Sequence, residues 1–164
     1  MNMSNDLLGR IEALDKGLLS VEEQRDLAAA LGTARDSRSE AALLSLLGNE
    51  DAIVRYNAII ALGFDRGIRS AAPILKKIAT SDPDEDCRDA AVSVLGNIFQ
   101  NTKDREVLSI LGSLALSDAD EIIRRSAYKA ALIVYGVSRE EHLSLLQDKT
   151  LVVDTEKVGM MLAN

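Results

Sequence analysis

The sequence is poor in the residue types on which many catalytic and metal-binding sites depend. Its 164 residues include one cysteine, Cys87, one histidine, His142, and no tryptophan. A single cysteine excludes an internal disulfide framework and is typical of a reducing compartment, so we expect a cytoplasmic protein. One histidine and one cysteine cannot supply the ligands of a His-rich or Cys-rich zinc site. We therefore expect neither a metal centre nor another cofactor.

The sequence also lacks a long apolar run and an excess of positive charge. No apolar run reaches about 18 residues, the length that spans a bilayer, and residues 1–5 carry no secretory signal pattern. The 26 acidic residues exceed the 19 basic ones, for a net charge of −7. Binding to nucleic acid or to a membrane surface draws on excess lysine and arginine. We therefore expect neither as a partner, and the charge favours another protein, in particular a basic one.

What the sequence does contain is a repeat. Three segments align without gaps over thirteen residues: 51–63 (DAIVRYNAIIALG), 84–96 (DEDCRDAAVSVLG) and 120–132 (DEIIRRSAYKAAL). Each begins with aspartate and carries arginine four residues later and alanine three further on. A weaker copy lies at 20–32 (SVEEQRDLAAALG), so the copies begin 31, 33 and 36 residues apart. A period in this range indicates an array of similar units.

Each repeated segment has the pattern of an amphipathic helix. In 51–63 the apolar residues are spaced as one face of a 3.6-residue period, and the leading aspartate suits an N-cap. Gly63 and Gly96 are expected to end their helices in a left-handed conformation. Three S-x-x-E capping boxes are also predicted, at Ser20 and Glu23, Ser37 and Glu40, and Ser138 and Glu141. The helices predicted between the repeated segments cover 6–15, 38–47, 71–80, 104–116 and 139–147.

Paired helices of this kind cannot bury their apolar faces alone, so they must stack. We predict an all-α fold, an α-solenoid of stacked antiparallel helix pairs with about four to five repeats. The length favours one domain over residues 1–164, with the core repeats at about 18–147. Residues 1–17 and 148–164 are expected to form the N-terminal and C-terminal caps. In the second cap Val158, Met161 and Leu162 form a short apolar stripe.

The segments 40–63 and 70–98 resemble HEAT repeats. In that family an Asp or Asn before the second helix of a repeat and an Arg inside it form a structural ladder between repeats. The matching residues here are Asn49, Arg55, Asp82, Arg88, Asp118 and Arg124. The recurring arginines also suggest an anion site, but the resemblance favours structural pairing.

The resemblance further implies that the second helices line a concave, ligand-facing surface. The residues two, five and nine positions after the leading aspartate point away from the apolar stripe. We call these nine residues the predicted binding face: Ile53, Tyr56, Ile60, Asp86, Asp89, Ser93, Ile122, Arg125 and Lys129. Apolar and aromatic anchors with charged flanks suit a protein partner. The alternative is that the isoleucines contact adjoining repeats and the charges form a solvated face.

The run of five carboxylates between Asp82 and Asp89 has a simpler explanation than a metal site. It lacks the glycine and the spacing of an EF-hand loop, and capping of the following helix accounts for most of it. Cys87 falls at a core-facing position of the repeat, so we expect a buried thiol that behaves as a small hydrophobe.

No catalytic motif accompanies the repeats. A Gly-rich phosphate loop, a G-x-S-x-G elbow and an H-E-x-x-H pair are all missing from the sequence. We therefore predict a non-catalytic scaffold or adaptor that binds a protein through the predicted binding face. Its small size and acidity also resemble those of bacterial immunity proteins, which neutralise a cationic toxin. The alternative is a subunit of a bilin lyase-type enzyme, since those subunits share short HEAT-like repeats.

Overall fold

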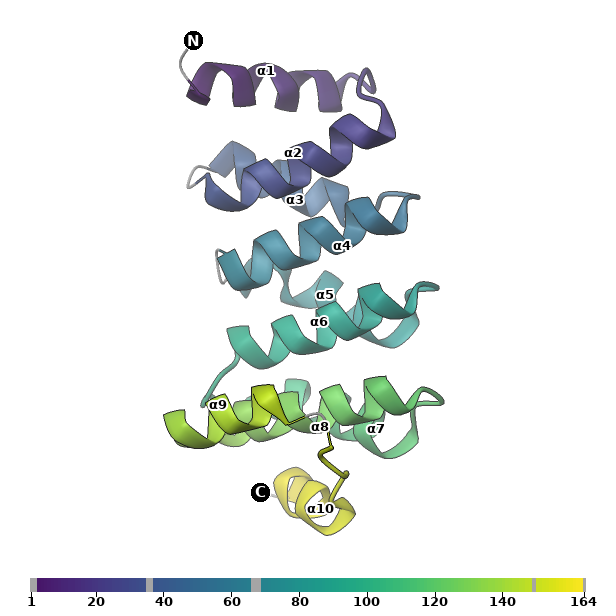
Figure 1. The fold of residues 1–164 in the computed structure, drawn as a ribbon, viewed down its shortest axis with the longest axis vertical. Helices are drawn as coiled ribbons and strands as arrows, with labels where there is room; N and C mark the ends of the chain where they lie inside the picture. Colours follow the sequence, from purple (N-terminus) through teal and green to yellow (C-terminus); the bar gives the residue numbers. More distant parts are fainter. Residues whose placement is uncertain (1–2, 35–36, 66–68, 149, 164) are drawn as a thin grey trace. The chain divides into compact units, whose positions relative to one another are not determined.

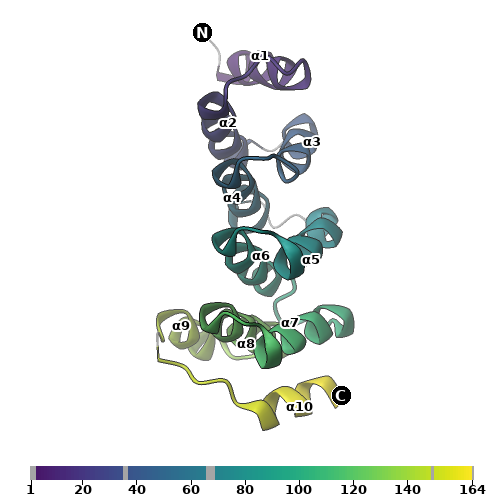
Figure 2. The same cartoon turned by 90° about the vertical axis from the view of Figure 1, so that its right-hand side faces the viewer.

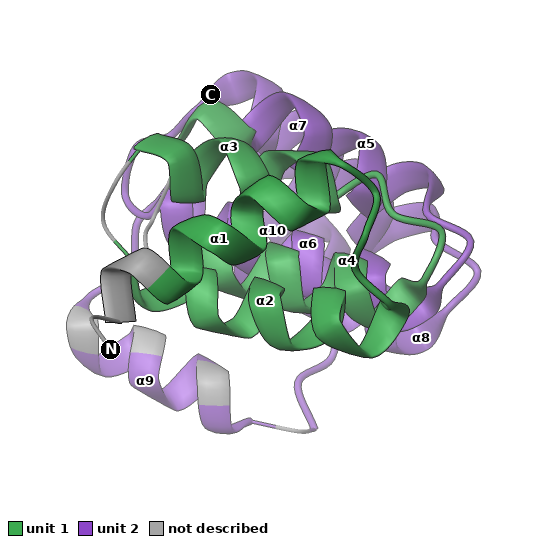
Figure 3. Ribbon diagram, turned by 90° about the horizontal axis from the view of Figure 1, so that it is seen from above, with its two compact units in different colours: residues 1–71 green, residues 72–164 purple. Residues whose placement is uncertain are grey.

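The structure, a computed structural model, describes residues 3–34, 37–65, 69–148 and 150–163. Within these ranges every regular element is a helix, and neighbouring helices pack in pairs (Figures 1 and 2). The all-α solenoid of helix pairs predicted from the repeats is thereby confirmed. The chain forms two compact units, Met1–Ala71 and Ala72–Asn164 (Figure 3). The prediction of one domain with two end caps stays a prediction.

The described residues of the first unit form four α-helices and two short helices of other types. The elements are α1 (Met3–Asp15), α2 (Val21–Thr33), α3 (Ser37–Leu46), α4 (Ala52–Ile60), the π-helix η1 (Ala61–Asp65) and the 3₁₀ helix η2 (Arg69–Ala71). Helix α2 packs along α4, and α3 packs against both. The core of this unit is aliphatic, with Leu27, Leu31, Leu43, Ile59 and Leu62 fully buried.

In the second unit the part of the chain that the structure describes forms six α-helices. These are α5 (Ala72–Ser81), α6 (Glu85–Ile98), α7 (Arg105–Ser117), α8 (Glu121–Tyr135), α9 (Arg139–Gln147) and α10 (Thr155–Ala163). Helix α8 packs against both α6 and α7, and α9 lies beside α8 on the side away from α7 (Figure 2). Cys87 on α6 is fully buried, as predicted.

The helix starts follow the sequence signals closely. Asp51, Asp84 and Asp120 cap α4, α6 and α8, and each carboxylate accepts a backbone N–H bond from the first turn. The capping boxes at Ser20 and at Ser138 are both formed. Helix α3 begins at Ser37 itself, and the two residues before it lie outside the described part, so the third box stays a prediction.

The prediction that Gly63 and Gly96 end their helices was wrong. Gly63 lies inside the π-helix η1 and Gly96 lies inside α6. Within the described residues the glycines with positive φ are Gly17 and Gly136 instead. Gly96 serves packing, since a Cβ on it would lie 2.9 Å from the Cβ of Ala130 and 3.0 Å from its Cα. A residue without a side chain lets α6 and α8 approach closely.

Helix α10 packs against α7 in the C-terminal part of the chain. Val158 and Met161 are buried there, as their apolar stripe predicts. Leu162 is still 43% exposed, yet its methyl groups cover Gly112 of α7. Their carbons lie 3.0 and 3.1 Å from the place that a Cβ on Gly112 would take. Small residues thus set the helix spacing at this contact too.

Candidate functional site

The loop that precedes α4, α6 and α8 has one recurring hydrogen-bond pattern. Two residues before each capping aspartate, the side chain of Asn49, Asp82 or Asp118 accepts the backbone N–H of that aspartate at 2.9 Å. The carboxylate of the aspartate then caps the helix. This double turn fixes the first turn of each helix relative to the loop before it. The three helices carry all nine residues of the predicted binding face.

The recurring arginines brace the same loops from inside the helices. The Nη1 atoms of Arg55, Arg88 and Arg124 donate to the backbone carbonyls of Asn49, Asp82 and Asp118, at 2.9, 2.9 and 2.7 Å. Arg55 is 8% exposed, so its guanidinium is a buried structural element. These contacts tie each arginine to the loop residue that the resemblance paired with it, through the backbone carbonyl. A ladder between successive repeats stays a prediction.

The first unit holds three residues of the predicted binding face, all on α4. Ile53 and Tyr56 are 51% and 40% exposed, and Ile60 is half-buried. Together they place an aliphatic and an aromatic side chain one turn apart on the surface. Such a pair is the usual anchor of a protein interface, because it offers apolar area at a small cost in conformational entropy.

A charged pair that the sequence reasoning missed lies beside these residues. Arg25 of α2 donates from Nε and Nη2 to the two carboxylate oxygens of Asp51, at 3.0 and 2.6 Å. These bonds, with the Val54 N–H bond to the same carboxylate, lower the pKa of Asp51 to about 2. Arg25 stands five residues after Ser20, the same repeat position as Tyr56, so extending the repeat alignment to α2 could have found it.

The second unit holds the other six residues, on α6 and α8. Asp86 is exposed, whereas Asp89 and Ser93 are partly buried. Burial raises the pKa of Asp89, and the hydroxyl of Ser126 opposes this rise by donating to the carboxylate. The Oδ1 atom of Asp89 is buried without a hydrogen-bond partner. Asp89 is therefore a partly desolvated acidic group and less exposed to a partner than Asp86.

The three residues of the predicted binding face on α8 differ in exposure and in their contacts with the rest of the chain. Ile122 is 62% exposed. Arg125 is bound to Glu121 one turn earlier, at 2.7 Å. Lys129 donates to the backbone carbonyl of Asp148, the residue that ends α9. The chain itself thus occupies part of the predicted binding face on this helix.

The segment after α9 also lines a cavity of about 300 Å³ on α8. Its walls are Glu121, Arg124 and Arg125 from the helix and residues 150–153 from the segment. Val152 in that segment is 81% exposed. Sequence reasoning missed this contact, since no spacing or motif links residues 148–153 to α8.

The described residues contain no group of three or more His, Cys, Asp or Glu that could hold a metal ion. The side chain of His142 lies outside the described part. Among the helices of that part, none combines the length and apolar character needed to cross a membrane. On α4 the described surface presents the exposed side chains of Ile53 and Tyr56, and on α8 it presents that of Ile122.

The comparisons with known proteins agree with the repeat pattern. The model of a family described as HEAT repeats matches residues 11–96, more than half of the chain. A comparison with curated proteins found no match. The matched region contains α2 to α5 and most of α6, and the loop and arginine pattern occurs twice in it. The resemblance drawn from the sequence is confirmed: the chain belongs to the HEAT-repeat family.

Proposed function

We propose that this protein is a non-catalytic scaffold that binds another protein through the predicted binding face. HEAT repeats are typically scaffolds for protein interactions. The observation that carries the proposal is the exposed pair Ile53 and Tyr56 beside the paired charges of Arg25 and Asp51. The aliphatic and aromatic groups supply binding energy, and the fixed charges orient the partner.

The second unit contributes through Asp86 and Ile122. Both side chains are exposed, whereas Asp89 and Lys129 already interact with their own chain. The acidic start of α6 and the net charge of −7 favour a partner with a basic surface. Complementary charge speeds association more than it strengthens the final complex.

Affinity capture from the native cell tests this proposal. Wild-type protein and the double variant Ile53→Ser with Tyr56→Ser are used as baits, and bound proteins are quantified by mass spectrometry. Loss of two anchor residues should reduce recovery of the true partner about tenfold or more. The matched control is Leu18→Ser with Val21→Ser, which removes two exposed apolar side chains elsewhere in the same unit. Equal recovery on all three baits would contradict the proposal.

Two narrower forms of this function stay predictions. A toxin-neutralising role rests on acidity and small size, and co-expression with the toxin should then rescue growth. A role as subunit of a bilin lyase-type enzyme requires a chromophore that co-purifies with the chain. The cytoplasmic location rests on the near absence of cysteine and stays a prediction as well.

A further inference from the structure

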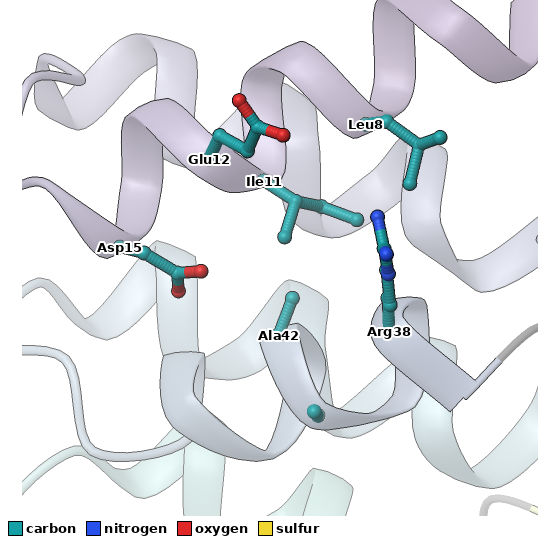
Figure 4. A pocket seen from close by; sticks show the side chains of 7 residues that line it. Leu8, Ile11, Glu12, Asp15, Arg38 and Ala42 are labelled. Carbon is teal, nitrogen blue, oxygen red and sulfur yellow. The ribbon is translucent and has the colours of Figure 1, made fainter.

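A groove in the first unit lies away from the predicted binding face, between α1 and α3 (Figure 4). Its volume is about 410 Å³. Helix α1 supplies one wall and helix α3 the other. The residues that line it are Leu8, Ile11, Glu12, Asp15, Arg38, Ala41 and Ala42. Ile11 and Ala42 are buried at 6% and 3% exposure, and with Leu8 and Ala41 they form the apolar part of a lining that is otherwise polar.

The groove exists because α3 has small side chains where the equivalent helices have large ones. Aligning the three loop residues Asn49, Asp82 and Asp118 puts Ala41 and Ala42 at the positions of two larger aliphatic residues in each of the other helices. These larger residues are Ile74 and Leu75 in α5, and Ile110 and Leu111 in α7. Each alanine lacks three side-chain carbons relative to its counterparts. The apolar side of α1 is also incompletely covered, since Leu7, Leu8 and Leu14 are only half-buried.

The rim of the groove carries opposite charges at its two ends. The exposed carboxylates of Glu12 and Asp15 stand along α1, and Asp15 marks one end (Figure 4). Arg38 and Leu8 lie at the other end. From Leu8 to Asp15 the wall extends over eight residues of α1, or roughly 10 Å, the length of two helical turns. Two carboxylates against one guanidinium leave the rim net negative. Together with the aliphatic residues of the lining, this charge complements a segment that is both aliphatic and basic.

We propose that this groove docks an amphipathic, basic helix of a partner protein. Aliphatic side chains from two successive turns of that helix lie over Ile11, Ala41 and Ala42. Lysine or arginine side chains lie over Glu12 and Asp15. A helix fits better than an extended chain, because a row of side chains at i, i+3, i+4 and i+7 matches a groove two turns long. The site is separate from the predicted binding face and does not depend on it.

Two synthetic helices of about 18 residues test the proposal, since shorter peptides are poorly helical. Both carry one leucine face; the other face is lysine in the first peptide and glutamate in the second. We expect the lysine peptide to bind more tightly and to shift the backbone amide NMR signals of α1 and α3. High salt should weaken binding, because part of the attraction comes from exposed charges.

Variants of the groove make the test specific. Ala41→Leu fills the groove from an exposed position and should weaken binding of the lysine peptide about tenfold or more. Its matched control is Ala29→Leu on the exposed surface of α2. Glu12→Lys with Asp15→Lys should reverse the preference toward the glutamate peptide, whereas Asp26→Lys on α2 should not.

The outcomes separate clearly. Equal binding of both peptides, unchanged binding by Ala41→Leu, or signal changes confined to other helices would each overturn the proposal. If circular dichroism shows that Ala41→Leu does not fold, the charge reversal decides alone. The Ile53→Ser with Tyr56→Ser variant should keep full peptide affinity, so this test is independent of the proposed scaffold function.

Discussion

Helices α2 and α4 in the first unit and helices α6 and α8 in the second are packed pairs of the same kind, but their charges are arranged differently. Arg25 and Asp89 occupy the same repeat position, five residues after the residues that cap α2 and α6. In the first pair Arg25 binds the capping residue of the next helix, Asp51. In the second pair burial raises the pKa of Asp89, and the negative charge of Asp120, the next capping residue, adds to the rise.

The difference shows that the helix pairs do not depend on ion pairs for their packing. Between α6 and α8 the carboxylates of Asp89 and Asp120 repel each other, whereas Arg25 and Asp51 attract each other between α2 and α4. Helices α6 and α8 still pack closely, with Gly96 against Ala130. Exposed ion pairs contribute little, because water screens both charges before and after pairing. Apolar burial and the absence of a side chain at Gly96 therefore carry the α6–α8 contact.

The largest effect is expected from Gly96→Ala. The new methyl group would lie 2.9 Å from the Cβ of Ala130 and 3.0 Å from its Cα, so the two helices must separate. We expect a loss of about 1–3 kcal/mol in the free energy of unfolding, measured by urea denaturation. The matched control is Gly159→Ala in α10, where a Cβ meets no atom within 4 Å. It should gain about 0.5–1 kcal/mol from helix propensity; losses of equal size would contradict the packing argument.

A smaller effect of opposite sign is expected from Asp89→Asn. The raised pKa means that, between its unfolded and folded pKa values, the folded protein binds more protons than the unfolded one. The free energy of unfolding therefore falls as the pH rises through the raised pKa. Asparagine keeps an acceptor for Ser126 and removes the buried charge. We expect a gain of up to about 1 kcal/mol at neutral pH, which disappears in acid.

Thermal unfolding of Asp89→Asn across the pH range checks this prediction. The same charge change at Asp26, an exposed residue of α2, provides the control and should leave the pH profile near that of the wild type. If Asp89→Asn destabilises the protein at neutral pH, the charge of Asp89 stabilises the fold, and the prediction is wrong.

The smallest change in stability is expected from Arg25→Met, whose readout is a titration. Without the guanidinium the pKa of Asp51 should rise from about 2 toward the ordinary value of about 3.9, while the Val54 N–H bond keeps it somewhat lower. At a pH above the ordinary pKa of aspartate, the lowered pKa of Asp51 stabilises the fold, and this stabilisation is lost as the pH falls toward 2. In the variant the pKa shift is smaller, so the free energy of unfolding falls less over the same pH range. Carboxyl NMR measures the midpoint, and Arg10→Met should leave it unchanged.

The helices and their starts were predictable because their causes are local. A capping aspartate lies within three residues of the backbone N–H whose hydrogen bond it accepts. Asp51, Asp84 and Asp120 all cap as expected. The burial of Cys87 followed from the helical period. The contacts of the predicted binding face were harder to predict. A position in the repeat indicates which way a side chain points but not which residues from other elements contact it. Lys129 held by the carbonyl of Asp148 is such a neighbour.

The amino-acid sequence by itself determined that the chain is helical, repetitive and a member of the HEAT-repeat family, since period, capping and recurring arginines are encoded within single repeats. Only the tertiary structure decided that Gly96 packs against Ala130, that Arg25 forms an ion pair with Asp51, and that a groove lies between α1 and α3. Those outcomes depend on which side chains meet across helices, and contacts between distant residues leave no regular spacing in the sequence.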